Sequence, residues 1–419
     1  MNYLNQPVLT IFYQFNPWQS SVGGIQTVIL NFIKYAPDEF KLRLVGTSVD
    51  SNESIGQWTT AELAGRELEF LPLLRVENDN VRGIIPTTLR YTLALLGRSL
   101  ASDFMHFHRL EPALATMGWS GEKTFFVHND IQKQICEGTE NAILWGQFPL
   151  LYFMLERFLM GQFDQVLSPH TDSVEFYRKR YPHLASHTSY VKNSVDTQIF
   201  YPLSSGERNK NKNEYSQSIG LSPGTPLLLF AGRLHPQKNP ILAIRALAAL
   251  NSRMSQRKPH LLIVGDGELL TASQLEIDRT GLSKQVTLLG SLNFNELADL
   301  YRLCDAFVIT SAFEAVPIVA LEALACGTPV VTTRCGEMPN IITRNNGVLC
   351  NESTPSAISE ALHKVLMHPE NFPAAACTQA AQPYWAKTVI TDVFQQMWQR
   401  WEKEQDRSSK KSLRPKIKM

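Results

Sequence analysis

A chain of 419 residues is too long for one hydrophobic core of ordinary size, so we expect two domains of roughly 150–200 residues each. Hydrophobic residues make up 44% of the chain and charged residues 19%, which is typical of globular proteins and argues against wholesale disorder. The net charge of +1 provides no overall field that would attract nucleic acid or an acidic polymer, so no nucleic-acid partner is expected.

The cysteines and the longest apolar run bear on where the protein works. No two of the six cysteines form a Cys-x-x-Cys pair, which disfavours zinc and dithiol chemistry and favours reduced thiols. The first apolar run is short and lacks a basic leader, so we expect no secretory signal. The longest apolar run, residues 142–160, contains a proline and charged residues and makes a poor membrane span. A cytoplasmic location is therefore predicted.

In the first half of the chain, short apolar runs rich in β-branched residues alternate with segments of helical period. Strands are expected at 7–13, 42–47, 104–107, 124–128 and 165–168, and helices at 24–35 and 150–161. This alternation is typical of a parallel sheet that carries helices on both faces.

The same pattern restarts after the polar segment 204–217, which we interpret as an exposed connection. Strands are expected at 226–231, 260–264, 286–289, 306–310, 328–332 and 347–349, with helices at 240–250 and 385–401. We therefore predict an α/β fold of two Rossmann-like, doubly wound units. Its expected parts are a first domain (1–203), a linker (204–223), a second domain (224–382), a helix packing back toward the first domain (383–403) and a disordered basic tail (404–419).

Rossmann-like units bind ligands at the carboxyl ends of their strands, so two facing units predict a shared cleft lined by residues that follow strands. Gly23, Gly24 and Gln26 lie between the first strand and the first helix, where the helix amides could face a phosphate. A plain turn explains the two glycines equally well. The dinucleotide fingerprint Gly-x-Gly-x-x-Gly is absent, which counts against an NAD oxidoreductase.

His128 ends the expected strand at 124–128, where its ring could donate a hydrogen bond to a sugar hydroxyl or a carbonyl. A structural histidine bonded to backbone groups is the alternative. His106, His108 and Arg109 end the preceding strand in a similar way, and for these three residues we favour a structural role.

Arg233 and Lys238 follow the first strand of the second unit, where two cations on one loop suit a diphosphate. Unrelated surface cations are the alternative. Gly265 and Leu289 lie at the ends of the next two strands, and both could belong to ordinary turns. The second of these turns also lies where a flat base could rest against backbone groups.

The segment from Ser311 to Gly327 carries the sharpest signal. Pro317 suits the first turn of a helix that Gly327 ends. Glu314 then lies in the loop before the helix and Glu322 more than one turn into it, both among apolar residues where a carboxylate is costly unless it is bonded. One carboxylate could reach a transferred sugar and the other a ribose, while the first-turn amides near Ile318 and Val319 could face phosphates.

Together these features resemble the family-4 retaining glycosyltransferases, or glycosyl transferases group 1, which have the GT-B fold. The resemblance extends over nearly the whole chain. It rests on Gly-Gly-Ile-Gln at 23–26, His128, Asn193-Ser-Val-Asp196 with Phe200, Ala-Gly-Arg233 with Lys238-Asn, Val-Gly-Asp-Gly at 264–267, and the two glutamates separated by seven residues.

The resemblance implies a role for each matching residue. In the second unit, Arg233 and Lys238 would bind the donor diphosphate, Glu322 the ribose and Glu314 the donor sugar. The amides of Ile318 and Val319 would contact phosphate or sugar. In the first unit, His128 would contact the donor sugar, Gly24 would approach the phosphate and Gln26 would contact the acceptor. Gly265 and Leu289 complete the donor-binding set.

Three departures from the family pattern bear on the donor's identity more than on activity. Ala315-Val316-Pro317 stands where relatives often have Gly-Phe-Gly, and Ser194 stands where Asn-Gly-Val-Asp is usual. The segment 335–340, Cys-Gly-Glu-Met-Pro-Asn, lacks the glutamate that usually ends Gly-Gly-x-Pro-Glu.

The expected function is transfer of a sugar, with retention, from a UDP- or GDP-sugar to a hydroxyl of a glycan, lipid-linked or small-molecule acceptor. No metal cofactor is expected, since cations can hold the diphosphate and the chain has no Asp-x-Asp motif. The alternatives are a sugar-nucleotide epimerase and a non-catalytic nucleotide-sugar-binding protein. Aromatic residues around 145–153 and the basic tail leave open a peripheral contact with the inner face of a membrane. The acceptor is expected to contact the loops 15–21, 76–86 and 131–141.

Overall fold

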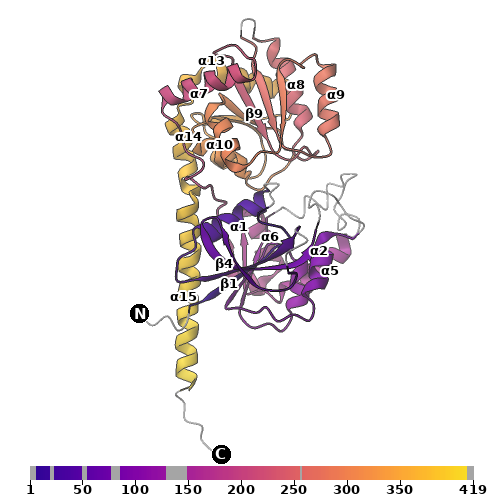
Figure 1. Ribbon diagram of the computed structural model, residues 1–419, viewed down its shortest axis with the longest axis vertical. Coiled ribbons are helices and arrows are strands. Elements are labelled where there is room, and N and C mark those ends of the chain that lie inside the picture. Colours follow the sequence, from indigo (N-terminus) through magenta and orange to yellow (C-terminus); the bar gives the residue numbers. More distant parts are fainter. Residues whose placement is uncertain are drawn as a thin grey trace, which may run out of the picture. The chain divides into compact units, whose positions relative to one another are not determined.

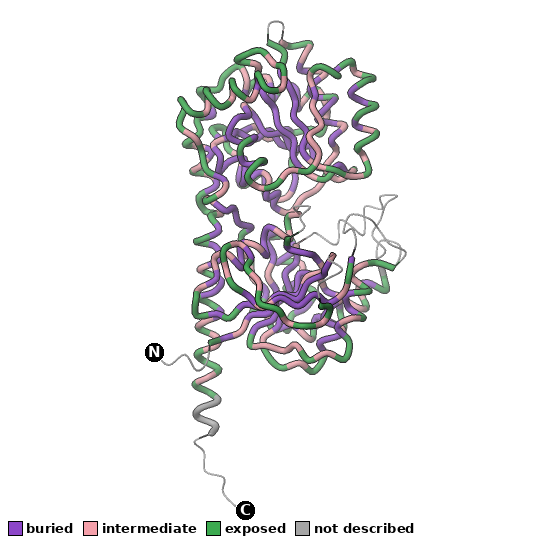
Figure 2. The backbone as a smooth tube through the Cα atoms, viewed as in Figure 1, coloured by how far each residue is buried: buried purple, intermediate pink, exposed green. Residues whose placement is uncertain are grey.

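The computed structural model describes residues 6–18, 23–49, 54–76, 85–128, 149–254 and 257–412. The chain forms two compact units (Figure 1). Unit 1 comprises Met1–Lys192 together with Lys387–Met419, and unit 2 comprises Asn193–Ala386. In both, the buried backbone is concentrated in the strands (Figure 2).

Within the described residues, unit 1 is built on an eight-stranded sheet in the order β3-β4-β2-β1-β5-β6-β7-β8. Its strands are β1 (Val8–Phe12), β2 (Lys41–Ser48), β3 (Thr59–Leu63), β4 (Arg66–Arg75), β5 (Phe104–Phe107), β6 (Glu122–Phe126), β7 (Gln165–Ser168) and β8 (Thr188–Tyr190). Neighbouring strands are parallel except for the hairpin of β3 and β4, which Ala64 and Gly65 close with positive φ angles of 53° and 75°. The hairpin and the three-residue β8 are additions to the expected strands.

Helices cover both faces of this sheet. They are α1 (Gly24–Lys34), α2 (Thr87–Leu95), α5 (Pro149–Met160), α6 (Thr171–Arg180) and α15 (Ala386–Ser412), with the short helices η1 (Glu111–Thr116) and η2 (Pro182–His187). Alternate side chains of a strand point to opposite faces. His106 of β5 therefore meets Phe32 of α1 at 5.5 Å, whereas Phe107 packs in a cluster with residues of α2, α5 and α6.

Unit 2 is built on a parallel sheet in the order β11-β10-β9-β12-β13-β14. The strands are β9 (Leu227–Ala231), β10 (His260–Val264), β11 (Val286–Gly290), β12 (Ala306–Ile309), β13 (Val330–Thr333) and β14 (Gly347–Cys350). The helices are α7 (Ser205–Ser218), α8 (Pro240–Asn251), α9 (Leu270–Arg279), α10 (Phe294–Leu303), α11 (Ile318–Ala325), α12 (Met338–Ile341), α13 (Pro355–Met367) and α14 (Ala374–Ala381), with η3 (Pro369–Asn371) and η4 (Gln382–Tyr384). These elements match the expected doubly wound pattern.

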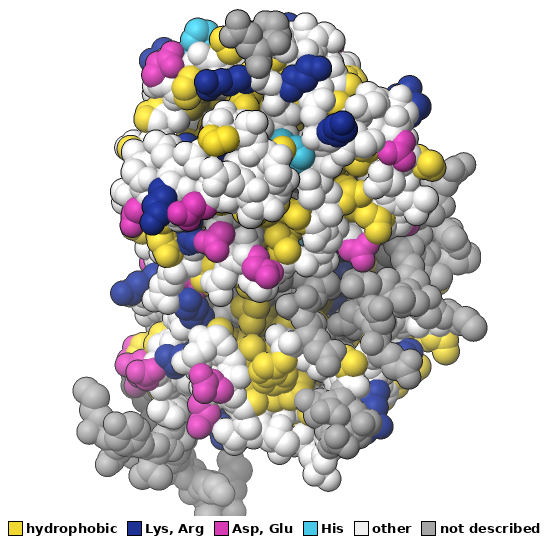
Figure 3. Space-filling model, turned by 45° about the horizontal axis from the view of Figure 1, so that its top comes forward, with side chains coloured by type: hydrophobic (Ala, Val, Ile, Leu, Met, Phe, Trp, Pro, Cys, Tyr) yellow, Lys and Arg dark blue, Asp and Glu magenta, His cyan; other side chains and the backbone are white. Residues whose placement is uncertain are grey.

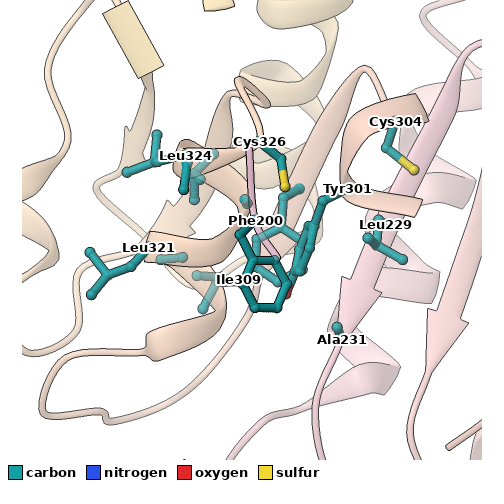
Figure 4. Close-up of a cluster of buried hydrophobic side chains, with 14 of the residues drawn as sticks. Phe200, Leu229, Ala231, Tyr301, Cys304, Ile309, Leu321, Leu324 and Cys326 are labelled. Carbon is teal, nitrogen blue, oxygen red and sulfur yellow. The ribbon is translucent and has the colours of Figure 1, made fainter. Parts of the chain in front are cut away.

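Two buried clusters, one on each face, hold this second sheet. One packs β9 and β12 side chains against α10 and α11, and Figure 4 shows Tyr301 of α10 in this cluster with Phe200 and Ile309. The other packs the opposite strand faces against α8 and α13. The strands are buried on both faces, which explains why they appear in the sequence as continuous apolar runs.

The segment that we expected to be an exposed connection is mostly exposed, but it forms the helix α7, which the sequence analysis did not predict. Ser204 caps α7, since its Oγ accepts a hydrogen bond from the Glu207 N–H at 3.4 Å. Arg208 and Lys212 both form ion pairs with Asp305, which attach α7 to unit 2. The helix therefore depends on capping and charge pairs, neither of which produces the hydrophobic periodicity that we searched for.

The closing helix α15 is longer than expected and runs to Ser412, into the segment that we expected to be disordered. It is attached to β6 by Arg400, which makes two hydrogen bonds to Glu122 at 2.6 and 2.8 Å. Among the helices that the structure describes, none combines the length and the apolar character needed to cross a bilayer.

Candidate functional site

The loop between β9 and α8 carries the two cations that the sequence assigns to a diphosphate. Asn239 ends the loop with a φ of 51°, and its side chain caps α8 by accepting the Leu242 N–H at 3.2 Å. Lys238 is partly buried, while Arg233 at the start of the loop is exposed. The loop thus holds one cation against the protein and leaves the other facing outward.

Lys238 and Glu314, which the sequence predicts to hold phosphate and sugar, are in direct contact. The Lys238 ammonium forms an ion pair with Glu314 Oε1, and the Ser311 hydroxyl donates to the same oxygen at 2.7 Å. The Glu314 side chain is only 10% exposed. A nearly buried carboxylate is stable here because a cation and a hydroxyl both bind it.

Backbone contacts hold the two loops together after the neighbouring strands β9 and β12. Thr310 Oγ1 donates to the carbonyl oxygens of Lys238 and Asn239 at 2.9 and 2.8 Å. Gln237 Nε2 donates to the Phe313 carbonyl at 3.0 Å, and the Ala312 N–H donates to the Gln237 carbonyl at 2.8 Å. The contact between Lys238 and Glu314 is therefore built into the fold of unit 2.

Two supports of the Glu314 loop were missed by the sequence analysis. Gly336 has a φ of 49°, and a Cβ at this position would lie 1.9 Å from the Ala315 carbonyl oxygen. Asn193 Nδ2 donates to the Val316 carbonyl at 2.9 Å. Both residues lie in motifs that the sequence analysis had singled out, but it assigned neither of them a role. Their contacts are to backbone atoms, which no side-chain pattern reveals.

Glu322 lies in α11 and is 3% exposed. The hydroxyl of Tyr301, itself fully buried, donates to Glu322 Oε2 at 3.2 Å. Burial raises the pKa of Glu322 to about 7, although the bond from Tyr301 acts in the opposite direction. A ligand that donates further hydrogen bonds to Glu322 would stabilise the ionised form of this buried carboxyl group.

The amides predicted to face phosphate open the same helix. Pro317 is the residue before α11, so Ile318 and Val319 are its first two residues, and their N–H groups precede the hydrogen-bonded ladder. Gly327, with a φ of 81°, follows the last turn and ends the helix as expected.

Gly265 and Leu289 lie toward the edge of the sheet. A Cβ at Gly265 would be 2.0 Å from the Gly232 carbonyl oxygen. The Gly265 N–H donates to the Gly290 carbonyl at 2.8 Å. Gly265 therefore allows the chain segments after β9, β10 and β11 to pack closely, in addition to any ligand contact. Leu289 is a partly buried residue of β11, two strands away from β9.

In unit 1, Gly24 and Gln26 form the beginning of α1. Gly24 is the first residue of the helix, and the Gln26 side chain accepts the Gly23 N–H at 2.6 Å. Gln26 thus has a structural role at the helix end beside the acceptor-binding role predicted for it.

His128 follows β6 and is bonded to another histidine. Its Nε2 lies 2.7 Å from Nδ1 of His108, which follows the neighbouring strand β5. Burial lowers the pKa of His128 to about 3, and the nearby Arg109 cation acts in the same direction. Burial also lowers the pKa of His106 to about 3 and that of His108 well below its usual value. At neutral pH these rings are uncharged.

Parts of the loops expected to contact the acceptor lie outside the described residues, namely 19–21, 77–84 and all of 131–141. In the first of these loops, Trp18 is described: its Nε1 donates to the Glu62 carbonyl at 3.1 Å, and its ring meets Phe70 edge-on. Across the described ranges, no group of three or more His, Cys, Asp or Glu side chains could hold a metal ion. Acidic and basic side chains are interspersed on the face that Figure 3 shows.

Comparison with known proteins covers both the family and the fold. Residues 211–382 match the family model of glycosyl transferases group 1. A D-inositol 3-phosphate glycosyltransferase of Nocardiopsis dassonvillei is 30% identical over 249 residues, which are 56% of each chain. A second one, from Corynebacterium jeikeium, is 33% identical over 183 residues, covering 42% of this chain and 43% of the relative. The chain thus spans about half the length of the curated relatives it matches.

Solved structures resemble almost the whole chain. Sucrose-phosphate synthase from Thermosynechococcus elongatus matches with a TM-score of 0.75 and 17% identity, over 94% of this chain and 99% of that one. Anabaena HepE in complex with UDP and glucose matches with a TM-score of 0.68 and 15% identity, over the same shares. Residues 211–382 of the second unit thus resemble the glycosyl transferases group 1, and the fold of the chain is that of the GT-B glycosyltransferases.

Proposed function

We propose that this protein is a retaining glycosyltransferase that moves a sugar from a UDP- or GDP-sugar to a hydroxyl of a glycan, lipid-linked or small-molecule acceptor. The observation that carries the proposal is the cluster of Lys238, Glu314 and Ser311, which lies in the segment that matches the family model. Such a cluster offers a cation for a leaving diphosphate and a carboxylate for sugar hydroxyls on adjoining loops.

In the proposed reaction the acceptor hydroxyl attacks the anomeric carbon from the face that the nucleotide diphosphate leaves. The bond from the acceptor oxygen to the anomeric carbon forms, and the bond to the β-phosphate oxygen breaks. The departing phosphate oxygen takes up the proton of the acceptor hydroxyl. Arg233, Lys238 and the amides of Ile318 and Val319 stabilise the negative charge that collects on the diphosphate.

The remaining residues bind the donor and the acceptor. Glu322 would accept hydrogen bonds from the ribose, which stabilises its buried carboxylate. Glu314 would bind the donor sugar while the Lys238 ammonium binds the phosphate. On unit 1, we assign His128 to the donor sugar, Gly24 to the phosphate and Gln26 to the acceptor.

The donor base can be identified by binding. Solved structures of similar fold include HepE with UDP-glucose and a starch synthase catalytic domain with ADP, so adenine is tested beside uracil and guanine. A nucleotide that binds only the folded protein adds about 2.7 kcal/mol of stability at a hundred times its Kd. A thermal-shift screen with UDP-, GDP- and ADP-sugars therefore selects the donor.

A lipid-linked acceptor at a membrane surface is supported by exposed apolar faces on α2 and α5. The exposed side chains include Leu89 and Leu93 of α2 and Met154 and Phe158 of α5, each at least 45% exposed. The exposed charged side chains of these two helices, Arg90 and Arg157, are basic, which suits anionic lipid. Co-sedimentation with anionic vesicles, and its absence with neutral ones, would support this acceptor class.

The decisive experiment combines the selected donor with candidate acceptors and measures release of nucleoside diphosphate. Acceptor-dependent release, with the anomeric configuration of the donor preserved in the product, supports the proposal. A rearranged sugar formed without acceptor would instead identify an epimerase, and binding without turnover a non-catalytic protein. Undiminished turnover in EDTA is expected, since the cations and amides serve the diphosphate.

A further inference from the structure

The two histidines that follow β5 and β6 are joined by a hydrogen bond between their rings. Nδ1 of His108 and Nε2 of His128 are 2.7 Å apart, and the planes of the two rings differ by only 17°. The ring centroids are 5.0 Å apart, so the two nitrogens lie close to the line that joins the centroids. The proton between them then lies near the plane of both rings, which is the favourable geometry for a hydrogen bond to a ring nitrogen. The contact is therefore a well-aligned N–H···N hydrogen bond.

The surroundings hold His108 in this position. Its ring is 2% exposed and lies on Phe126, with centroids 4.8 Å apart and planes at 11°. Tyr13 meets it edge-on at 6.2 Å. A ring packed in this way cannot turn away from His128 without opening the core of unit 1.

Both rings are neutral, so each carries one N–H. Either His108 donates from Nδ1 and leaves its own Nε2 bare, or His128 donates from Nε2 and His108 carries its proton on Nε2. Nε2 of His108 is buried and has no hydrogen-bond partner among the residues that the structure describes. A buried N–H without an acceptor is the rarer and more costly arrangement, so the first alternative is favoured.

We propose that His108 is a positioning residue that holds His128 as the neutral Nδ1–H tautomer, so that His128 offers the sugar a hydrogen-bond donor and not a base. This inference deepens the role proposed above for His128 and rests on it for its consequence in catalysis. It gives His108, for which the sequence favoured a purely structural role, a function in the reaction. The residue acts only through His128.

The tautomer is measured on the full-length protein labelled with 15N-histidine, because a protonated and a bare ring nitrogen differ in their 15N shifts. The resonances of His128 are assigned by their loss in His128→Gln. We expect Nδ1 of His128 to be protonated and its Nε2 to be bare at pH 7.5. A proton on Nε2 of His128 would overturn the inference.

The kinetic test compares two substitutions of His108. His108→Phe keeps the ring on Phe126 but removes the bond, and we expect kcat to fall about tenfold while the donor KM changes by no more than about twofold. His108→Asn places an amide where Nδ1 was, and we expect it to restore most of the lost kcat. A purely structural role predicts no rescue by the smaller asparagine.

His106→Phe is the matched control. His106 lies on the same side of β5 as His108 and contacts the same Phe126 ring at 4.9 Å, but within the described residues its ring makes no hydrogen bond to His128. We expect its kcat to remain unchanged. If the wild-type protein turns over no donor, the proposed function fails, whereas the NMR result still decides the tautomer. An unchanged His128 tautomer and unchanged kcat in His108→Phe would refute the positioning role.

Discussion

The candidate site residues of the two units have opposite electrostatic character. Unit 2 contains an ion pair, Lys238 with Glu314, and a buried carboxyl group, Glu322. Unit 1 instead places uncharged imidazole rings, those of His108 and His128, against Phe126. Charged groups suit a diphosphate and neutral donors suit hydroxyl groups, so the two units offer a ligand different kinds of contact.

The two units also respond to pH in opposite directions. Glu322 has a pKa of about 7, above its ordinary value, so its contribution to stability is present at low pH and is lost as the pH rises through 7. His106 has a pKa of about 3, below its ordinary value, so its contribution is present above pH 6.5 and is lost as the pH falls. Glu322 therefore destabilises unit 2 at high pH, and His106 destabilises unit 1 at low pH.

The largest expected effect tests the charged side of the comparison. Lys238→Ala should lower kcat by about 10²–10³, because the leaving diphosphate loses a cation that stabilises its charge. Turnover is measured at saturating donor. Lys284→Ala, an exposed lysine of the same unit, serves as the control and should leave kcat unchanged. Undiminished turnover in Lys238→Ala would remove this residue from the mechanism.

The second prediction concerns the cost of the buried carboxyl group in unit 2. At pH 8 a folded-state pKa near 7 corresponds to a stability cost of up to about 3 kcal/mol relative to an ordinary glutamate. Glu322→Gln should therefore stabilise the protein at pH 8 and have little effect at pH 4.5, as measured by urea unfolding. The same substitution should weaken donor binding, so gain of stability and loss of affinity occur together. Equal stability changes at both pH values would contradict the assignment.

The third prediction tests the neutral side. Between pH 7.5 and pH 5, the buried His106 should cost unit 1 about 2 kcal/mol, since the unfolded chain takes up a proton that the folded ring does not. Amide hydrogen exchange in β5 and β6 should accelerate at pH 5, after correction for intrinsic rates, more than exchange in α11. His106→Phe should remove only part of this acceleration, because His108 and His128 also have lowered pKa values. Equal acceleration in β5, β6 and α11 would contradict the prediction that acid destabilises unit 1 more than unit 2.

The sequence predicted the two doubly wound units, and it predicted that Lys238 and Glu314 both lie at the carboxyl ends of strands of the second unit. It could do so because the residues follow strands that appear as clear apolar runs, and β9 and β12 turned out to be neighbours. Their direct ion pair was not predicted, since it depends on the exact course of two loops.

Other features left no such pattern in the sequence. The bond from His108 to His128 requires β5 and β6 to be adjacent and in register, which a single sequence does not reveal. Gly336 and Asn193 act through backbone carbonyls, and α7 depends on a cap and ion pairs in place of an apolar face. The sequence therefore predicts side-chain chemistry at strand ends better than the contacts that orient it.

The smallest expected effect sharpens the comparison, because it asks which unit controls the pH dependence of donor binding. An ionised Glu322 accepts stronger hydrogen bonds from ribose than a protonated one, so the donor KM should fall about tenfold between pH 6 and pH 8. Glu322→Gln should abolish this dependence. His128→Gln should preserve it, since His128 stays neutral throughout this range. If His128→Gln abolished the pH dependence and Glu322→Gln preserved it, unit 1 and not unit 2 would control the pH dependence of donor binding.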